Sequence, residues 1–206
     1  MPRPHRLTLP VALIAALAAA PASAQIFAQT TFENGFEGWG ALFSSDPSGL
    51  GDHIVDGGPG QGQVFRHINN AWGVEFRNTT NQAFLGDYTR YGNAINFSFD
   101  ERNASLDFFQ GWTGRAFHLQ FTKNLDNGRS IIASYEFYRV MPDEGWVTHS
   151  LDIDLTSTDT PDGWRLFYNN LDPVTDYTFA DIMRDVDTVT LSNFNPDFAY
   201  PSGWFA

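Results

Sequence analysis

Short runs of alternating hydrophobic and polar residues recur along the chain and predict β-strands. In the segment YGNAINFSF, Ile95, Phe97 and Phe99 fall on one face of an extended chain, and Asn96 and Ser98 fall on the other. A period of two with one apolar face is typical of a strand that covers a core on one side. The segment therefore predicts a half-buried strand.

The same pattern continues through the following segments and is interrupted by turn residues. RAFHLQF places Phe117, Leu119 and Phe121 inward and predicts that His118 and Gln120 face solvent. SIIASYEFYRV and WVTHSLDIDL read as further strands, and the LDNGR sequence before the first of them predicts a tight hairpin. Helical periodicity is almost absent, so the chain is predicted to be an all-β sandwich or barrel.

One segment departs from this pattern. In TDYTFADIMRDV, Phe179, Ile182 and Met183 recur at helical spacing, and either Thr175 or Thr178 is placed to cap the first turn. The segment predicts one short helix near the C-terminus, after which DTVTLSNF returns to a strand.

The N-terminus has the features of a secretory signal peptide. Two arginines precede an apolar run, and the run ends in PASA, which fits cleavage after Ala24. We therefore expect residues 1–24 to be removed and residues 25–206 to form one secreted or periplasmic domain. No second apolar span follows, so no membrane insertion is expected after cleavage.

Charge and cysteine content exclude several classes of function. The chain has 12 Lys and Arg residues against 24 Asp and Glu residues, a net charge of −12. Such a surface repels phosphate backbones, so nucleic acid is not expected as a partner. The absence of cysteine excludes thiol nucleophiles and zinc–thiolate sites. The many aromatic residues supply the material for a core instead.

Three ordered groups of segments resemble the laminin IV type A domain, also called laminin B, in the form found in secreted bacterial proteins. They are GGPGQGQVFRH with AWGVEF, then QAFLGDYTRYGNAINFSFD, and last GWVTHSLDIDL with DGWRLF and TFADIMRDVDTVTLSNF. The resemblance covers residues 31–204. It implies a jelly-roll sandwich similar to galactose-binding-like domains, and it supplies no catalytic residues. The sequence departs from the family where it stops at PSGWFA, so the final strand is expected to be missing.

The resemblance, together with the aromatic content, predicts a non-catalytic extracellular module that binds a glycan or another cell-surface or matrix component. Sugar rings stack on exposed aromatic side chains, which combine an apolar face with a polar tip. Trp112 lies in a glycine-flanked stretch and is the first candidate, and Tyr88 and Tyr91 follow it. A surface protein without a ligand is the alternative.

The opening TTFENGFEGW suggests a structural calcium ion as the one cofactor to consider. In related jelly rolls, the first glutamate of such a stretch supplies a calcium oxygen together with a late aspartate, and Glu33 matches that position. Calcium takes about six to eight oxygen ligands, and the late aspartate is missing here. Glu33 is equally well explained as a solvated edge residue.

Paired carboxylates raise a second alternative, a glycan-active hydrolase. Asp152 and Asp154 share one face of a predicted strand, and we expect Glu136 on a neighbouring strand. Two carboxyl groups that flank a glycosidic bond can hydrolyse it. The same pattern also describes the solvent face of any strand in an acidic protein.

Overall fold

The computed structural model describes residues 26–41, 52–54, 63–65, 75–102, 115–140 and 145–193. The predicted leader (1–24), Trp112 and the PSGWFA end, where the final strand is expected to be missing, lie outside these residues. Among the helices that are described, none is long and apolar enough to cross a membrane.

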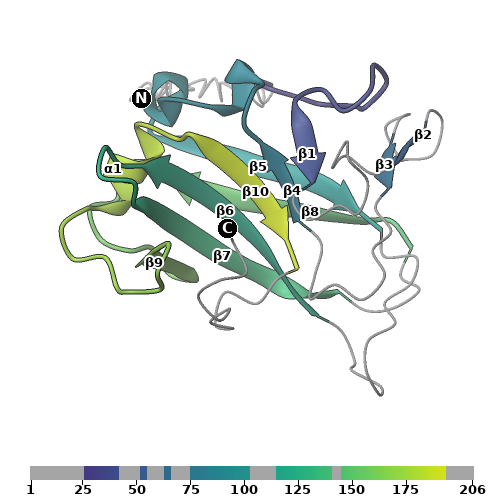
Figure 1. Cartoon of the computed structure of the whole chain (residues 1–206). Helices are drawn as coiled ribbons and strands as arrows, with labels where there is room; N and C mark the ends of the chain where they lie inside the picture. The colour runs from purple at the N-terminus through teal and green to yellow at the C-terminus, as the bar shows by residue number, and fades with distance from the viewer. Residues whose placement is uncertain are drawn as a thin grey trace, which may run out of the picture.

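Six antiparallel strands form the main sheet, in the order β1-β4-β10-β6-β7-β9. Figure 1 shows the strands β6, β7 and β10 side by side at its centre. The six strands are β1 (Trp39–Ala41), β4 (Glu75–Asn78), β10 (Thr188–Ser192), β6 (Arg115–Asn124), β7 (Ser130–Val140) and β9 (Trp164–Tyr168).

Two further pairs of antiparallel strands complete the described β-structure. The strand β5 (Ala94–Glu101) pairs with β8 (Val147–Asp154) along its whole length, and β2 (Asp52–Ile54) pairs with β3 (Gln63–Phe65). In Figure 1, β5 and β8 form a second layer behind the main sheet. The alternation predicted for β5 is confirmed, because Phe97 is buried while Asn96 and Ser98 are exposed.

The core lies between the main sheet and the β5–β8 pair and is built largely from aromatic rings. Phe97 of β5 meets Phe121 of β6 edge to face, with ring centroids 6.0 Å apart. Across the layers, Phe99 meets Phe137 edge to face at 5.2 Å, and its ring lies 5.4 Å from the tilted ring of Phe117. Two sheets joined by one aromatic core make an all-β sandwich, as the sequence predicted. The jelly-roll order of its strands stays a prediction.

The hairpin between β6 and β7 is confirmed, with a longer loop than the tight turn predicted. The Leu125 amide donates to the Arg129 carbonyl at 2.8 Å, and the Gly128 amide donates to the Leu125 carbonyl at 3.0 Å. Only Gly128 adopts a positive φ, of 78°, whereas a two-residue type I′ turn needs two such residues. The loop therefore presents Asp126 and Asn127 at one end of the sheet.

The prediction that His118 faces solvent is wrong. The side chain is 4 % exposed, although it lies on the face of the main sheet opposite Leu119 and Phe121. Its cross-strand neighbour Ser192 is buried as well, so this face is not open to solvent here. The register of β6 against β7 also shifts between Phe117 and His118, an irregularity that the period of two does not reveal.

The predicted helix is present as α1 (Phe179–Met183), with Thr178 as its N-cap. The Asp181 amide donates to Thr178 Oγ1 at 3.1 Å, and Asp181 Oδ2 accepts from the Thr178 amide at 2.9 Å. This reciprocal pair is a capping box. Phe179, Ile182 and Met183 are buried, which confirms the helical spacing read from the sequence.

Because Thr178 caps α1, Thr178→Ala is expected to lower the free energy of unfolding by about 1 kcal/mol. Urea unfolding followed by tryptophan fluorescence measures the change. Thr175→Ala is the matched control, since Thr175 is exposed and lies outside the cap. Equal losses in the two variants would show that the capping box does not stabilise the protein.

The capping box also predicts a pH dependence. Hydrogen bonds from the Thr178 hydroxyl and amide hold the pKa of Asp181 below its usual value. A lowered pKa in the folded state stabilises the protein above the unfolded-state pKa of about 3.9, and that stabilisation is lost as the pH falls through the folded value. Wild-type stability measured from pH 6 to pH 3 is expected to fall by more than that of Asp181→Asn. Parallel curves for the two proteins would contradict this expectation.

The opening stretch TTFENGFEGW forms a compact turn that leads into β1. The Glu37 carboxylate accepts from the Thr31 amide at 3.1 Å and from the Asn34 amide at 3.3 Å. The Glu37 carbonyl accepts from Asn81 Nδ2 at 3.1 Å, which ties the turn to the residues after β4. Trp39 then enters the core with 5 % of its surface exposed. The stretch begins the sandwich, as predicted.

Candidate ligand-binding site

The structure places Tyr88 in the core, where it presents no ring face to a ligand. Its side chain is 4 % exposed, and its hydroxyl donates to the Phe84 carbonyl at 2.7 Å. Its ring meets Phe121 edge to face at 5.4 Å. Burial, reinforced by the neighbouring Tyr91, raises the pKa of Tyr88. The sugar-stacking role predicted for Tyr88 does not fit this position.

Tyr91 is half-buried, and its ring is already in contact with other side chains. The Phe27 ring lies 4.6 Å from it between centroids, and the Arg90 guanidinium lies 4.6 Å from its centroid. Its hydroxyl donates to the Ala83 carbonyl at 3.1 Å and accepts from Arg90 at 2.6 Å. Stacking of a sugar on Tyr91 stays a prediction that requires these contacts to be displaced.

Glu33 is exposed, and the carboxylate that organises its turn belongs to Glu37. Within the described ranges, no group of three or more His, Asp and Glu side chains is placed to hold a metal ion. The calcium ion at Glu33 stays a prediction.

The three carboxylates considered for hydrolysis do not meet. Asp152 and Asp154 are exposed on the outer face of β8, whereas Glu136 lies on β7 in the main sheet, so the expectation of neighbouring strands was wrong. Asp152 accepts from Asn96 Nδ2 at 2.8 Å. Hydrogen bonds from the Thr156 hydroxyl and amide lower the pKa of Asp154. A general acid needs the opposite shift.

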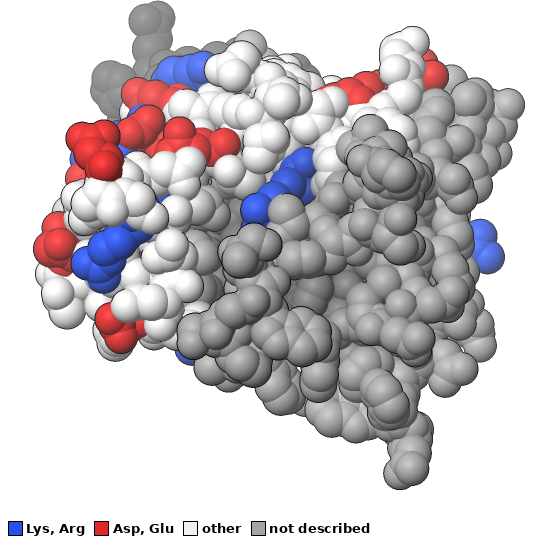
Figure 2. Space-filling view, in the orientation of Figure 1, with Lys and Arg blue, Asp and Glu red and all other residues white. Residues whose placement is uncertain are grey.

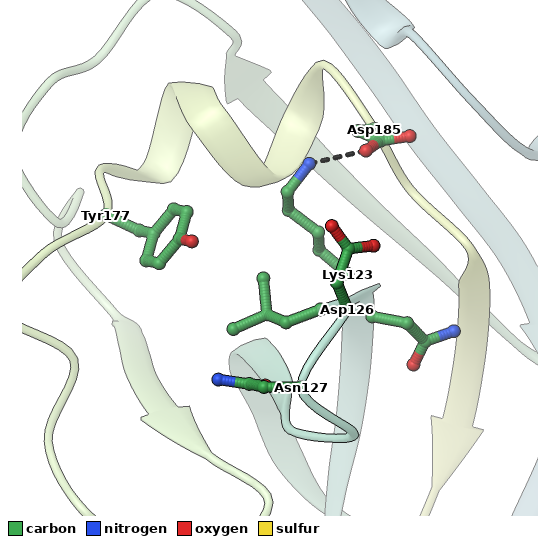
Figure 3. Close-up of a pocket in the computed structure, with 7 residues that line it drawn as sticks. Lys123, Asp126, Asn127, Tyr177 and Asp185 are labelled. Atoms are coloured by element: carbon green, nitrogen blue, oxygen red, sulfur yellow. Dashed lines mark hydrogen bonds and ion pairs between the residues drawn. The ribbon is translucent and has the colours of Figure 1, made fainter.

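A pocket of about 360 Å³ opens where the β6–β7 loop meets the two ends of α1. In Figure 3, Tyr177 lies on one side, Lys123 and Asp126 lie across from it, and Asn127 lies at the loop. The full lining consists of Lys123, Asn124, Leu125, Asp126, Asn127, Tyr177 and Asp185. The pocket therefore combines an aromatic ring, an aliphatic side chain, two amides and three charged groups.

One ion pair and two hydrogen bonds hold the loop side of the pocket to the segment after α1. Lys123 Nζ lies 2.5 Å from a carboxylate oxygen of Asp185. The Asn124 amide donates to Asp187 Oδ2 at 2.7 Å, and the Asp187 amide donates to the Thr122 carbonyl at 2.8 Å. The end of β6 and the start of β10 are thus joined at the pocket floor.

The residues on either side of Tyr177 in the chain are held in place. The preceding Asp176 accepts a hydrogen bond from the Tyr168 hydroxyl, which raises the pKa of Tyr168. The Arg129 guanidinium covers the Tyr168 ring, 3.5 Å from its centroid. The following Thr178 is fixed by the capping box. The pocket wall therefore belongs to a well-tethered segment.

Sequence reasoning did not find this pocket. Its residues come from three segments, 123–127, 177 and 185, and the sequence pattern gives Tyr177 no role beyond its place before a helix. The LDNGR turn was the available signal, because hairpin loops carry exposed polar side chains to the edge of a rigid sheet.

Comparisons with protein-family models, curated proteins and solved structures give no match to this chain. The laminin IV resemblance therefore stays a prediction, and the pocket is interpreted from its own residues.

Proposed function

We propose that the chain is a secreted, non-catalytic module of laminin IV type that binds a glycan in the pocket between the β6–β7 loop and α1. The observation that carries this proposal is the position of the Tyr177 ring opposite polar and charged side chains of the loop. A sugar unit has the same two properties, since its C–H groups form an apolar face and its hydroxyl groups form a polar rim.

The chemistry of the lining suits a polyhydroxylated ligand. Asp126 and Asp185 accept hydrogen bonds, while Lys123 donates them, and the amides of Asn124 and Asn127 do both. A hydroxyl group both donates and accepts, so it can pair with either kind of partner. The volume of about 360 Å³ lies at the low end of the range for small-molecule sites, about 300–1,000 Å³. A pocket of this volume suits one or two sugar units of a longer glycan.

Binding without turnover is the better-supported reading. Glu136 lies on a different sheet from Asp152 and Asp154, and the pKa of Asp154 is lowered where a general acid needs it raised. These positions favour a module that holds a polysaccharide over one that cleaves it.

Tyr177→Ala is expected to weaken glycan binding about tenfold, since the loss of one aromatic contact of about 1.4 kcal/mol changes affinity by that factor. Tyr177→Phe keeps the ring and is expected to stay within about threefold of the wild type. Isothermal titration with oligosaccharides selected from a glycan array measures both affinities, and thermal unfolding of each variant checks the fold.

Tyr91→Ala serves as the comparison, because Tyr91 was the other described aromatic candidate. If Tyr91→Ala lost binding and Tyr177→Ala kept it, the site would belong at Tyr91. Failure of the wild type to bind any glycan would refute the proposed function. Release of reducing ends from a bound polysaccharide would favour the hydrolase.

A further inference from the structure

The charges that line the pocket do not cancel. Lys123 is matched by Asp185 at 2.5 Å, with the lysine side chain 17 % exposed and the aspartate side chain 62 % exposed. Asp126 is exposed and makes no hydrogen bond or ion pair with the described part of the chain. In Figure 3, its carboxylate stands on the same side of the pocket as Lys123. One carboxylate is therefore left without a matching cation.

We infer, given the glycan-binding function proposed above, that this pocket selects a sugar unit bearing an ammonium group. Asp126 would pair with that group. The same unit with its amine acetylated has no charge to offer Asp126. A uronic acid would be repelled by Asp126, and it could pair with Lys123 only by displacing Asp185.

The acidic side chains around the pocket also favour a cationic ligand. Figure 2 shows acidic side chains gathered on the side of the molecule where α1 lies, and the whole chain has a net charge of −12. Exposed charges act over about 10 Å at 0.1 M salt, so such a field attracts a cationic glycan and is weakened by added salt. Charge alone would favour any cation, however, so the test must separate Asp126 from the general field.

The test uses three oligosaccharides of equal length: a hexosamine oligomer with free amines, its N-acetylated form and a uronic acid oligomer. Isothermal titration is carried out at low salt and at a pH where the amines are protonated. Exposed ion pairs contribute up to about 1 kcal/mol, so the wild type is expected to bind the free amine about three- to fivefold more tightly than the N-acetylated form. Asp126→Asn is expected to reduce this ratio to about one, because it weakens binding of the free amine more than binding of the N-acetylated form.

Asp162→Asn is the matched control. Asp162 is exposed just before β9, and the first residue of β9 pairs with Tyr135 in the middle of β7, away from the pocket loop. Removing this charge is expected to leave the ratio as in the wild type. An equal fall in both variants, an unchanged ratio in Asp126→Asn, or tightest binding of the uronic acid would each refute the selection. If the N-acetylated oligomer binds without any preference for the amine, the proposed function stands and only this inference fails. If none of the three binds while another glycan of the array does, the proposed function stands and this inference fails. If no glycan binds at all, both fail.

Discussion

Phe121→Ala is expected to lower the free energy of unfolding by about 3–5 kcal/mol. Phe121 is completely buried on β6, at the junction of the two layers. Its ring lies 6.0 Å from Phe97, 5.4 Å from Tyr88 and 5.8 Å from Trp164, between centroids. Alanine would remove these contacts and leave a cavity that rigid aromatic neighbours cannot fill. Domains of this size are stable by only about 5–15 kcal/mol, so the variant would lie near the limit of folding.

Urea unfolding followed by tryptophan fluorescence and circular dichroism measures this effect. Phe27→Ala makes the same chemical change at an exposed position, where the ring is 44 % exposed, and is expected to cost less than about 1 kcal/mol. Similar midpoints for the two variants would mean that the core does not lie where the structure places it.

Gly38→Ala is expected to give the second-largest loss, about 2–4 kcal/mol. Gly38 has a φ of 91°, a conformation that costs alanine about 1–3 kcal/mol. An added Cβ would also lie 2.9 Å from the backbone nitrogen of Asn81 and 2.7 Å from its Cβ. Backbone atoms cannot rotate away, so the turn and the residues after β4 would have to separate, at a further cost of about 1–3 kcal/mol.

Gly35→Ala in the same turn separates the two contributions. Gly35 has a similar φ of 98°, but nothing lies within 4 Å of an added Cβ. The effect of alanine on the unfolded chain is the same at both positions and cancels in the comparison. Gly38→Ala is therefore expected to exceed Gly35→Ala by at least about 1 kcal/mol in urea unfolding. Equal losses would show that the contact with Asn81 is relieved at no cost.

These two glycines explain the order of residues in TTFENGFEGW. Gly35 and Gly38 allow the turn, Glu37 closes it through the Thr31 and Asn34 amides, and Trp39 enters the core immediately afterwards. These structural roles account for the order of residues in the stretch. The proposed ligand site does not include this stretch. It lies at the loop of the β6–β7 hairpin, whereas the contact of Phe99 with Phe137 lies near the other end of the hairpin.

The local features of the fold were determined by the sequence itself. Alternation predicted the buried face of β5 and the inward residues of β6, and helical spacing located α1. These predictions succeeded because a period of two or 3.6 is a property of neighbouring residues and does not depend on distant partners. The all-β class followed from the same periodicity.

Only the tertiary structure decided which strands are neighbours and which faces are covered. Glu136 and Asp152 lie on different sheets because strand order joins segments far apart in the chain. His118 is buried because the second face of the main sheet is closed at that position, although the alternation of β6 is the usual one. The pocket likewise needs Asp126, Tyr177 and Asp185 to meet, and their proximity arises from the packing of the β6–β7 loop against both ends of α1. Local pattern is set by covalent geometry, whereas a site made of separated segments exists only once the sheets have packed.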